Sequence, residues 1–270
     1  RISPNSFDLA VLDALADAED PDTWDPQRLK SLQAAGAEVV MICSGIKAPR
    51  LPPNSAVHVV GYQPGGPIIT DDLGAPARMR WDLGFAPNDT IANEPSKRRA
   101  GRVAIALGGA ETQSVANTIV KGLADSPDVK DIVYLGSPLA CLQPDKSFLR
   151  PEQKLEVLRN LPSMDNQIQA AELLVVAYGN MMFEALGLCT PCVVTGVKAF
   201  QRRYARNIAG RGLAVAIDTE LSPGAVQKAV AAAMAAKEGL ARACAQTFPV
   251  SGMERLAEYL LAFLPIPSRA

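Results

Sequence analysis

Val103-Ala-Ile-Ala-Leu-Gly-Gly109 is a short apolar run that ends in two glycines, a pattern typical of a buried strand that turns directly into a helix. A second run, Leu173-Leu-Val-Val-Ala-Tyr-Gly-Asn-Met-Met-Phe-Glu184, has the same order of strand, glycine turn and helix start. The first N–H groups of a helix have no partner inside it, and its dipole adds partial positive charge there. The two turns therefore predict a site for phosphate groups.

Strand-like and helix-like patterns alternate outward from these turns through almost the whole chain, which predicts an α/β fold with a parallel sheet. Expected strands cover residues 7–12, 37–43, 56–61, 102–107, 132–135, 155–158, 173–177, 192–195 and 213–217. Expected helices cover residues 26–35, 112–123, 163–171, 180–188 and 200–210, with a helical tail that begins at the cap Ser222 and Pro223. Residues 62–86 are rich in glycine and proline and are expected to be mostly loop.

The distribution of polar and proline-rich segments predicts two Rossmann-like domains. Residues 1–90 form a partial amino-terminal domain, residues 91–101 a polar linker, and residues 102–270 a carboxy-terminal domain with a helical tail. Because a strand begins at Phe7 and no initiator methionine precedes it, we expect that the chain begins inside a longer protein or was trimmed.

Composition excludes several classes of function. The formal net charge of −1 gives no support to nucleic-acid binding, and no run approaches the roughly 18 apolar residues that a membrane span needs. Five cysteines, an odd number, in 270 residues favour a reduced, cytoplasmic protein without disulfides. With one histidine and no closely spaced ligand pairs of the zinc type, the sequence predicts neither a metal nor another cofactor.

Two isolated features have more than one interpretation. Cys189-Thr-Pro-Cys192 has the spacing of a redox motif, but it follows a helix and opens a strand, whereas a reactive pair opens a helix whose dipole lowers the thiol pKa. Packing in the core is the favoured interpretation, with redox chemistry as the alternative. His58 lies in a strand-like run and is expected to be packed or edge-facing rather than catalytic.

The glycine turns supply the first candidate ligand contacts. Gly108, Gly109 and Ala110 would let the backbone approach a ligand closely, although a tight strand-to-helix turn is the alternative. At the second turn, Asn180 is a helix cap, and the N–H groups of Met181 and Met182 would face a diphosphate. Glu184, one turn into that helix, would accept hydrogen bonds from ribose hydroxyls. Alternatively, Asn180 and Glu184 only stabilise the helix.

Strand-Gly-Gly, a polar helix and then Gly-x(4)-Glu-x(6)-Pro, at Gly179, Glu184 and Pro191, resembles the carboxy-terminal domain of GT-B glycosyltransferases. The pattern is most similar to the UDP-sugar hydrolase of pseudaminic acid biosynthesis and to spore-coat polysaccharide proteins. The resemblance implies two facing Rossmann-like domains with a UDP-sugar between them. It implies that the nucleotide is lined by Gly108, Gly109, Gly179, Asn180, Met181, Glu184 and Gln201.

The sequence departs from that family in the parts that carry chemistry. The family's amino-terminal glycine-rich loop with its catalytic histidine has no counterpart, and methionines replace the hydroxyl residues usual at the diphosphate helix. Asp13 falls where the family has residues near the sugar and is a candidate catalytic group. Arg202 shares a helix face with Arg203 and Arg206, where it would grip a diphosphate or an acidic sugar, or simply face solvent.

These observations predict a nucleotide-sugar glycosyltransferase or hydrolase that cleaves the anomeric C–O–phosphate linkage in surface polysaccharide or nonulosonic acid biosynthesis. The expected ligand is a UDP-linked sugar, with a protein partner or a missing amino-terminal segment completing the site. The alternative is a non-catalytic nucleotide-sugar-binding or scaffold module, or half of a split enzyme. A Rossmann-type oxidoreductase is disfavoured because no G-x-G-x-x-G occurs.

Overall fold

In a computed structural model, chain contacts divide the protein into two compact units, Arg1–Ala86 with Gly252–Ala270, and Pro87–Ser251. The structure describes residues 9–14, 31, 34, 38–43, 57–62, 64, 78–89, 98–108, 112–137, 142–196, 198–217 and 219–263. The domain boundaries expected from the sequence stay a prediction.

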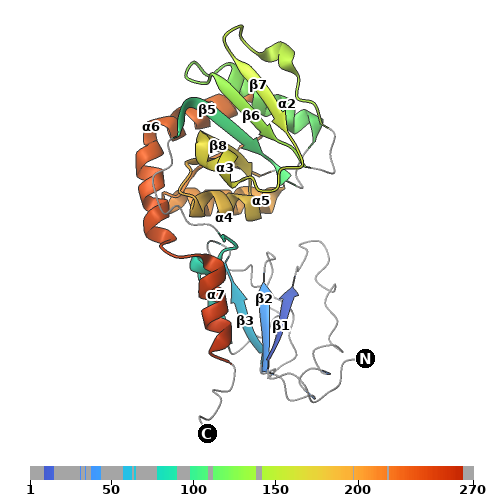
Figure 1. The fold of residues 1–270 in the computed structure, drawn as a ribbon, viewed down its shortest axis with the longest axis vertical. Coiled ribbons are helices and arrows are strands. Elements are labelled where there is room, and N and C mark those ends of the chain that lie inside the picture. Colours follow the sequence, from blue (N-terminus) through green and yellow to red (C-terminus); the bar gives the residue numbers. More distant parts are fainter. Residues whose placement is uncertain are drawn as a thin grey trace. The chain divides into compact units, whose positions relative to one another are not determined.

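The second unit is built on a parallel sheet with strand order β10-β9-β8-β5-β6-β7. Its strands are β5 (Arg99–Ala106), β6 (Asp131–Leu135), β7 (Lys154–Leu158), β8 (Ala171–Ala177), β9 (Cys192–Thr195) and β10 (Val215–Ile217). The chain builds the sheet in one direction from β5 to β7 and returns to the other side of β5 with β8 (Figure 1). It then proceeds through β9 to β10. The boundary between β5 and β8 is therefore a topological switch point, where open α/β sheets bind ligands.

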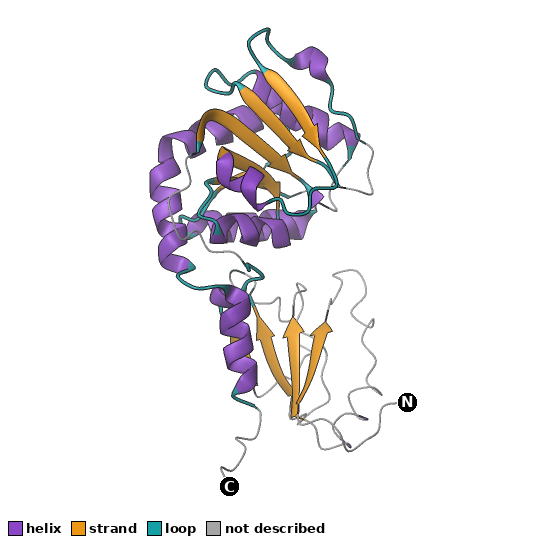
Figure 2. Ribbon diagram, viewed as in Figure 1, coloured by secondary structure: helices purple, strands orange, loops and turns teal. Residues whose placement is uncertain are grey.

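Helices cover both faces of this sheet because right-handed crossovers place them on opposite sides when the direction of strand order reverses (Figure 2). They are α2 (Gln113–Ala124), α3 (Asp165–Ala170), α4 (Asn180–Gly187), α5 (Ala199–Gly210) and α6 (Pro223–Thr247), with a 3-10 turn at Lys146–Phe148. Alternate strand residues such as Val103, Ile105, Leu173 and Val175 form one apolar core with α2 and α6. The strand and helix positions expected from the sequence after residue 101 are confirmed to within a few residues.

Side-chain caps explain where two of these helices begin. Thr112 Oγ1 accepts a hydrogen bond from Val115 N at 3.2 Å at the start of α2. Ser222 Oγ accepts one from Ala225 N at 3.2 Å, and Pro223 occupies the first position of α6. Both caps satisfy N–H groups that the helix itself leaves unpaired.

The first unit has a parallel four-stranded sheet in the order β1-β2-β3-β4. Its elements are β1 (Leu9–Ala14), β2 (Glu38–Cys43), β3 (Val57–Gly61), β4 (Arg78–Trp81), a 3-10 turn at Leu83–Phe85 and α7 (Gly252–Leu261). Arg255 of α7 reaches Asp82 with a 3.0 Å contact between Nη2 and Oδ2. The guanidinium of Arg80 lies 5.0 Å from the centre of the Phe85 ring and 5.1 Å from that of Tyr259, so α7 is attached to this sheet by charge and aromatic contacts.

Two expectations for the amino-terminal part need comment. Residues 62–86 were expected to be mostly loop, and this is wrong for β4. Arg78-Met-Arg-Trp alternates polar and apolar residues, but over only four positions at the end of a segment rich in glycine and proline. Most of the helix expected at residues 26–35 lies outside the described residues, as does much of the expected linker. β5 begins at Arg99 and contains a register irregularity before Val103, where Gly101 adopts φ +75°.

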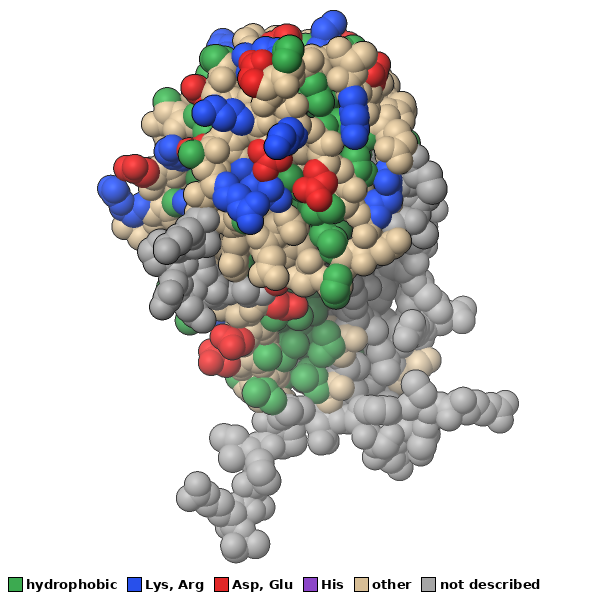
Figure 3. Space-filling model, turned by 45° about the horizontal axis from the view of Figure 1, so that its top comes forward, with side chains coloured by type: hydrophobic (Ala, Val, Ile, Leu, Met, Phe, Trp, Pro, Cys, Tyr) green, Lys and Arg blue, Asp and Glu red, His purple; other side chains and the backbone are tan. Residues whose placement is uncertain are grey.

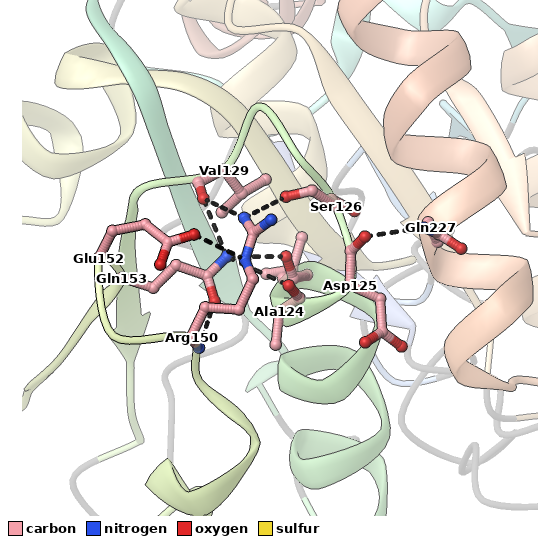
Figure 4. A network of polar contacts seen from close by, with 9 residues as sticks. Ala124, Asp125, Ser126, Val129, Arg150, Glu152, Gln153 and Gln227 are labelled. Atoms are coloured by element: carbon pink, nitrogen blue, oxygen red, sulfur yellow. Dashed lines mark hydrogen bonds and ion pairs between the residues drawn. The ribbon is translucent and has the colours of Figure 1, made fainter.

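Polar contacts connect the loops and the helix end at the amino edge of the second sheet, which is the side on which its strands begin. Gln153 Nε2 donates to Val129 O at 2.9 Å and to Ala124 O at 3.3 Å at the end of α2. Arg150 Nη2 donates to Ser126 O at 2.9 Å. Nearby, Gln227 Nε2 donates to the Asp125 carbonyl at 2.8 Å. The carbonyls of Ala124 and Asp125 lie at the end of α2, where a helix leaves acceptors unpaired (Figure 4). Figure 3 shows that charges of both signs are interspersed on one face of the molecule.

Among the described residues, no helix has the length and apolar content needed to cross a bilayer.

Candidate functional site

A cavity of about 540 Å³ lies at the carboxyl ends of β5 and β8, at the switch point of the second sheet. Both glycine turns contribute to it. The residues that line it are Ala106, Leu107, Gly108, Thr112, Ala177, Tyr178, Gly179, Asn180, Met181, Glu184, Lys198 and Gln201. The structure therefore brings together six of the residues that the sequence nominated, namely Gly108, Gly179, Asn180, Met181, Glu184 and Gln201.

The two glycines that face the cavity differ in backbone conformation. Gly108 has φ +55°, a left-handed conformation that favours glycine. Gly179 has φ 166°, which is extended and open to any residue. A Cβ added at Gly179 would meet no heavy atom within 4 Å. Neither conformation nor packing against the described residues therefore requires glycine at position 179, and its lack of a side chain leaves space in the cavity.

The first turn of α4 differs from the sequence expectation in two ways. Gly179 rather than Asn180 holds the cap position, and because glycine has no side chain, no side chain caps the helix. Met182 N donates to Gly179 O at 3.1 Å, and its side chain is fully buried. Met182 is therefore engaged within the helix, whereas Met181 lines the cavity.

Glu184 is a half-buried carboxylate in the cavity wall. Burial raises its pKa above the ordinary value, and the negative charges of Asp165 and Asp89 add to the effect. Both causes disfavour the ionised form. Glu184 can accept hydrogen bonds from hydroxyl groups of a ligand. Its nearby charged groups Asp165 and Asp89 are also acidic, so they do not balance its negative charge.

Gln201 joins two turns that line the cavity. Its Oε1 accepts a hydrogen bond from Lys198 N at 3.0 Å, and its Nε2 donates to Tyr178 O at 3.3 Å. One bond holds the turn between β9 and α5, and the other holds the residue before Gly179. The side chain that the family resemblance placed on the nucleotide therefore also fixes the shape of the cavity.

Six lining residues were not nominated from the sequence: the apolar strand-end residues Ala106, Leu107 and Ala177, and the side chains of Thr112, Tyr178 and Lys198. Thr112 is the cap of α2, and the ring of Tyr178 stacks on buried Tyr204 with centroids 5.3 Å apart. Lys198 is the cap residue directly before α5, three residues before Gln201. The signals available were the aromatic residue directly before Gly179 and the basic residue in the same turn as the nominated glutamine.

The other nominated residues lie elsewhere or are not described. Arg202 lines a neighbouring cavity of about 550 Å³ and donates through Nη1 to Gly196 O at 3.3 Å. Asp13 belongs to β1 of the first unit, and its side chain lies outside the described part of the structure, as do Gly109 and Ala110 entirely.

The histidine and the cysteine pair are held in packed surroundings. The rings of His58 and Phe263 lie 4.2 Å apart between centroids within the first unit. Cys189 follows α4 with φ +55°, and Cys192 opens β9 fully buried. Burial raises the pKa of both thiols, which keeps them protonated and unreactive. Within the described residues, no cluster of histidine, cysteine or acidic side chains is arranged to hold a metal ion.

No family model matches the sequence, and no curated protein matches it by sequence. Solved structures do match. Spinosyn rhamnosyltransferase SpnG complexed with thymidine diphosphate has a TM-score of 0.59 at 17% identity over 92% of this chain and 72% of that chain. The calicheamicin glycosyltransferase CalG4 has a TM-score of 0.54 at 14% identity, over 97% of this chain and 74% of CalG4. MurG of Acinetobacter baumannii has a TM-score of 0.56 at 11% identity, over 87% of this chain and 69% of MurG.

At these identities the likeness establishes the fold. The chain is an α/β protein with a six-stranded parallel sheet and a long helix α6 near its carboxyl end, and it is structurally similar to GT-B glycosyltransferases. Identity of 10–17% does not carry substrates or reactions from those proteins to this one.

Proposed function

We propose that the cavity between β5 and β8 binds a nucleoside-diphosphate sugar, UDP-linked, and that the chain acts as a GT-B glycosyltransferase or UDP-sugar hydrolase. One observation carries the proposal. The two glycine turns meet at the topological switch point, where open α/β sheets bind nucleotides. The complex of SpnG with thymidine diphosphate supports the same ligand class.

Each part of the ligand has a matching group in the cavity. Glu184 accepts the two ribose hydroxyls, and the uncapped first turn of α4 faces the diphosphate. A favourable helix-end contact contributes only about 0.3–1 kcal/mol, whereas a micromolar ligand needs roughly 8 kcal/mol. Ribose, base and sugar contacts must therefore supply most of the affinity, and the open space at Gly179 lets the ligand approach the backbone.

The reaction breaks the bond between the anomeric carbon and the diphosphate oxygen. The oxygen of water, or of a sugar or lipid hydroxyl, forms the new bond to that carbon and loses its proton to a base. The electron pair of the broken bond stays on the diphosphate, whose growing charge the helix N–H groups stabilise. As in the family that the sequence resembles, the products belong to surface polysaccharide or nonulosonic acid biosynthesis.

Calorimetry with UDP and its 2′-deoxy analogue dUDP tests the ribose contact. The wild-type chain should bind UDP with micromolar affinity and dUDP about tenfold more weakly, because a hydrogen bond to a charged group contributes about 1.5–3 kcal/mol. Glu184→Ala should lose most UDP affinity and the preference for UDP over dUDP. Glu156→Ala on β7, an exposed carboxylate absent from the cavity, is the matched control.

Gly179→Ala tests the same site by steric means. An alanine there meets no described atom within 4 Å, so the thermal midpoint of unfolding should change little while UDP affinity falls. Absence of UDP and UDP-sugar binding at millimolar concentration in the wild-type chain would reject the proposed function.

A non-catalytic nucleotide-sugar-binding module is the second candidate. It is favoured by the cavity wall, in which Glu184 is the only carboxylate among the described lining residues and histidine does not occur. Release of UDP from UDP-N-acetyl sugars distinguishes the candidates. Turnover that persists after removal of free nucleotide supports the enzyme, and tight binding without turnover supports the module.

A further inference from the structure

We infer that Lys198 supplies the positive charge that meets the diphosphate, and that Gln201 is the positioning residue that holds Lys198 at the cavity. The inference rests on the proposed function, since it assigns the charge recognition of the same ligand. It concerns a residue that the sequence patterns did not nominate.

The cavity needs a positive charge that its helix end does not provide. A diphosphate carries several negative charges, whereas the first turn of a helix contributes roughly half an elementary charge. Met181 adds no hydrogen-bond donor from its side chain, and the carboxylate of Glu184 opposes anion binding. Among the described residues that line the cavity, Lys198 alone is cationic.

The turn that carries Lys198 is fixed on both sides. A Cβ added at Gly196 would lie 2.4 Å from Arg202 N, so this turn packs tightly on the first turn of α5. Lys198 has an extended backbone, φ −91° and ψ 153°, just before α5 begins. Its exposed side chain therefore starts at the edge of the cavity, directly before the first turn of α5.

Gln201 connects this turn to the opposite wall. The same amide accepts from Lys198 N at 3.0 Å and donates to Tyr178 O at 3.3 Å, one residue before Gly179. The distance between the lysine and the start of α4 is thus set through one side chain. A diphosphate held between them gains charge-assisted contacts from one side and N–H donors from the other.

Calorimetry with uridine, UMP and UDP separates charge recognition from recognition of the nucleoside. Lys198→Gln should weaken UDP binding about tenfold or more, weaken UMP less, and leave uridine within about twofold. Lys198→Arg should retain most UDP affinity, and the dependence of binding on salt should be smaller in Lys198→Gln than in wild type. Arg203→Gln, which removes an exposed charge of α5 outside the cavity, should bind all three ligands like wild type.

Gln201→Leu tests the positioning role through a double-mutant cycle. It should lower UDP affinity severalfold in the wild-type background and have little further effect in Lys198→Gln, because both changes act through one charge. Unchanged circular dichroism and thermal midpoint would show that the variant folds. Additive losses would contradict the positioning role of Gln201.

The inference and the proposed function fail in different ways. If wild type binds neither UDP nor UDP-sugar, the proposed function fails and the inference with it. If wild type binds UDP, and Lys198→Gln binds it equally well, the inference is overturned while the proposed function stands.

Discussion

The six-stranded sheet has an amino edge, where its strands begin, and a carboxyl edge, where they end. The two differ in how their polar groups are satisfied. At the amino edge, Arg102 contacts Asp131 Oδ2 at 2.6 Å and Gln167 Oε1 at 2.7 Å. Glu172, at the same edge, accepts hydrogen bonds from Lys237 Nζ at 2.5 Å and from Gly101 N at 2.6 Å. At the carboxyl edge, half-buried Glu184 has acidic neighbours and faces a cavity. At the amino edge the buried charges are paired with one another, whereas at the carboxyl edge Glu184 lines a cavity next to acidic neighbours.

The same chemical group responds oppositely at the two edges. For Glu172, burial would raise the pKa, but hydrogen bonds from Lys237 and the Gly101 N–H outweigh it and lower the pKa below the ordinary value. For Glu184, burial and negative neighbours raise the pKa. Because a perturbed pKa measures the difference between charged and neutral forms, the comparison separates a carboxylate that stabilises the fold from one that costs stability.

Arg102→Met should produce the largest loss of stability, because it removes the contacts of Arg102 with Asp131 and Gln167 at the amino edge. Arg102 has a side chain only 6% exposed, and its removal leaves Asp131 and Gln167 without their partner. Because the Asp131 side chain is 33% exposed, loss of these charge-assisted contacts should cost about 2–3 kcal/mol. Urea unfolding at neutral pH measures the change through the transition midpoint.

Arg99→Met is the matched control, because Arg99 begins the same strand but is exposed. It should change the free energy of unfolding by less than about 0.5 kcal/mol. Equal losses in the two variants would mean that the buried contacts of Arg102 do not account for its effect.

Glu172→Gln should destabilise the protein by about 1–2 kcal/mol at neutral pH, since it weakens charge-assisted bonds to Lys237 and to the Gly101 N–H. The pKa of Glu172 is lower in the folded state than in the unfolded chain. Its stabilisation is therefore present above the unfolded pKa and is lost as pH falls through the folded pKa. Urea unfolding from neutral to acidic pH should show the difference between wild type and variant shrinking in acid.

The exposed carboxylate of Glu156 provides the comparison for that experiment. Glu156→Gln should show little change in stability at any of these pH values. A pH-independent difference for Glu172→Gln would indicate that lost packing, rather than the charge, causes its effect.

Local patterns were sufficient to predict much of the second unit. Apolar runs of strand length ending in glycine located β5 and β8, and the Ser222-Pro223 cap located the start of α6. β4 was missed because its alternation covers only four residues and the segment before it is rich in glycine and proline. The pairing of β5 with β8 brings together residues about 70 positions apart. Sequence order alone did not fix this pairing.

The candidate site was predicted only in part, because some of its residues are brought to the cavity by long-range contacts rather than by local patterns. Gly108, Gly179 and Glu184 stand at recognisable turns and helix starts, so their types and positions nominated them. Lys198 carries no such mark, because its place in the cavity depends on the order β9-β8-β5 and on the hydrogen bonds of Gln201. Tertiary contacts of this kind have no local signature in the sequence.

Glu184→Gln gives the smallest stability change and the opposite sign. Because the pKa of Glu184 is raised in the folded state, its ionisation costs stability, and this cost is absent below the unfolded pKa and complete above the folded pKa. Removing the charge should raise the free energy of unfolding at neutral pH by about 0.5 kcal/mol, a modest value for a half-exposed group. Urea unfolding should show the gain disappear in acid, and the same variant should bind UDP more weakly. A protein that became less stable at neutral pH would place Glu184 with Glu172, as a carboxylate that holds the fold together.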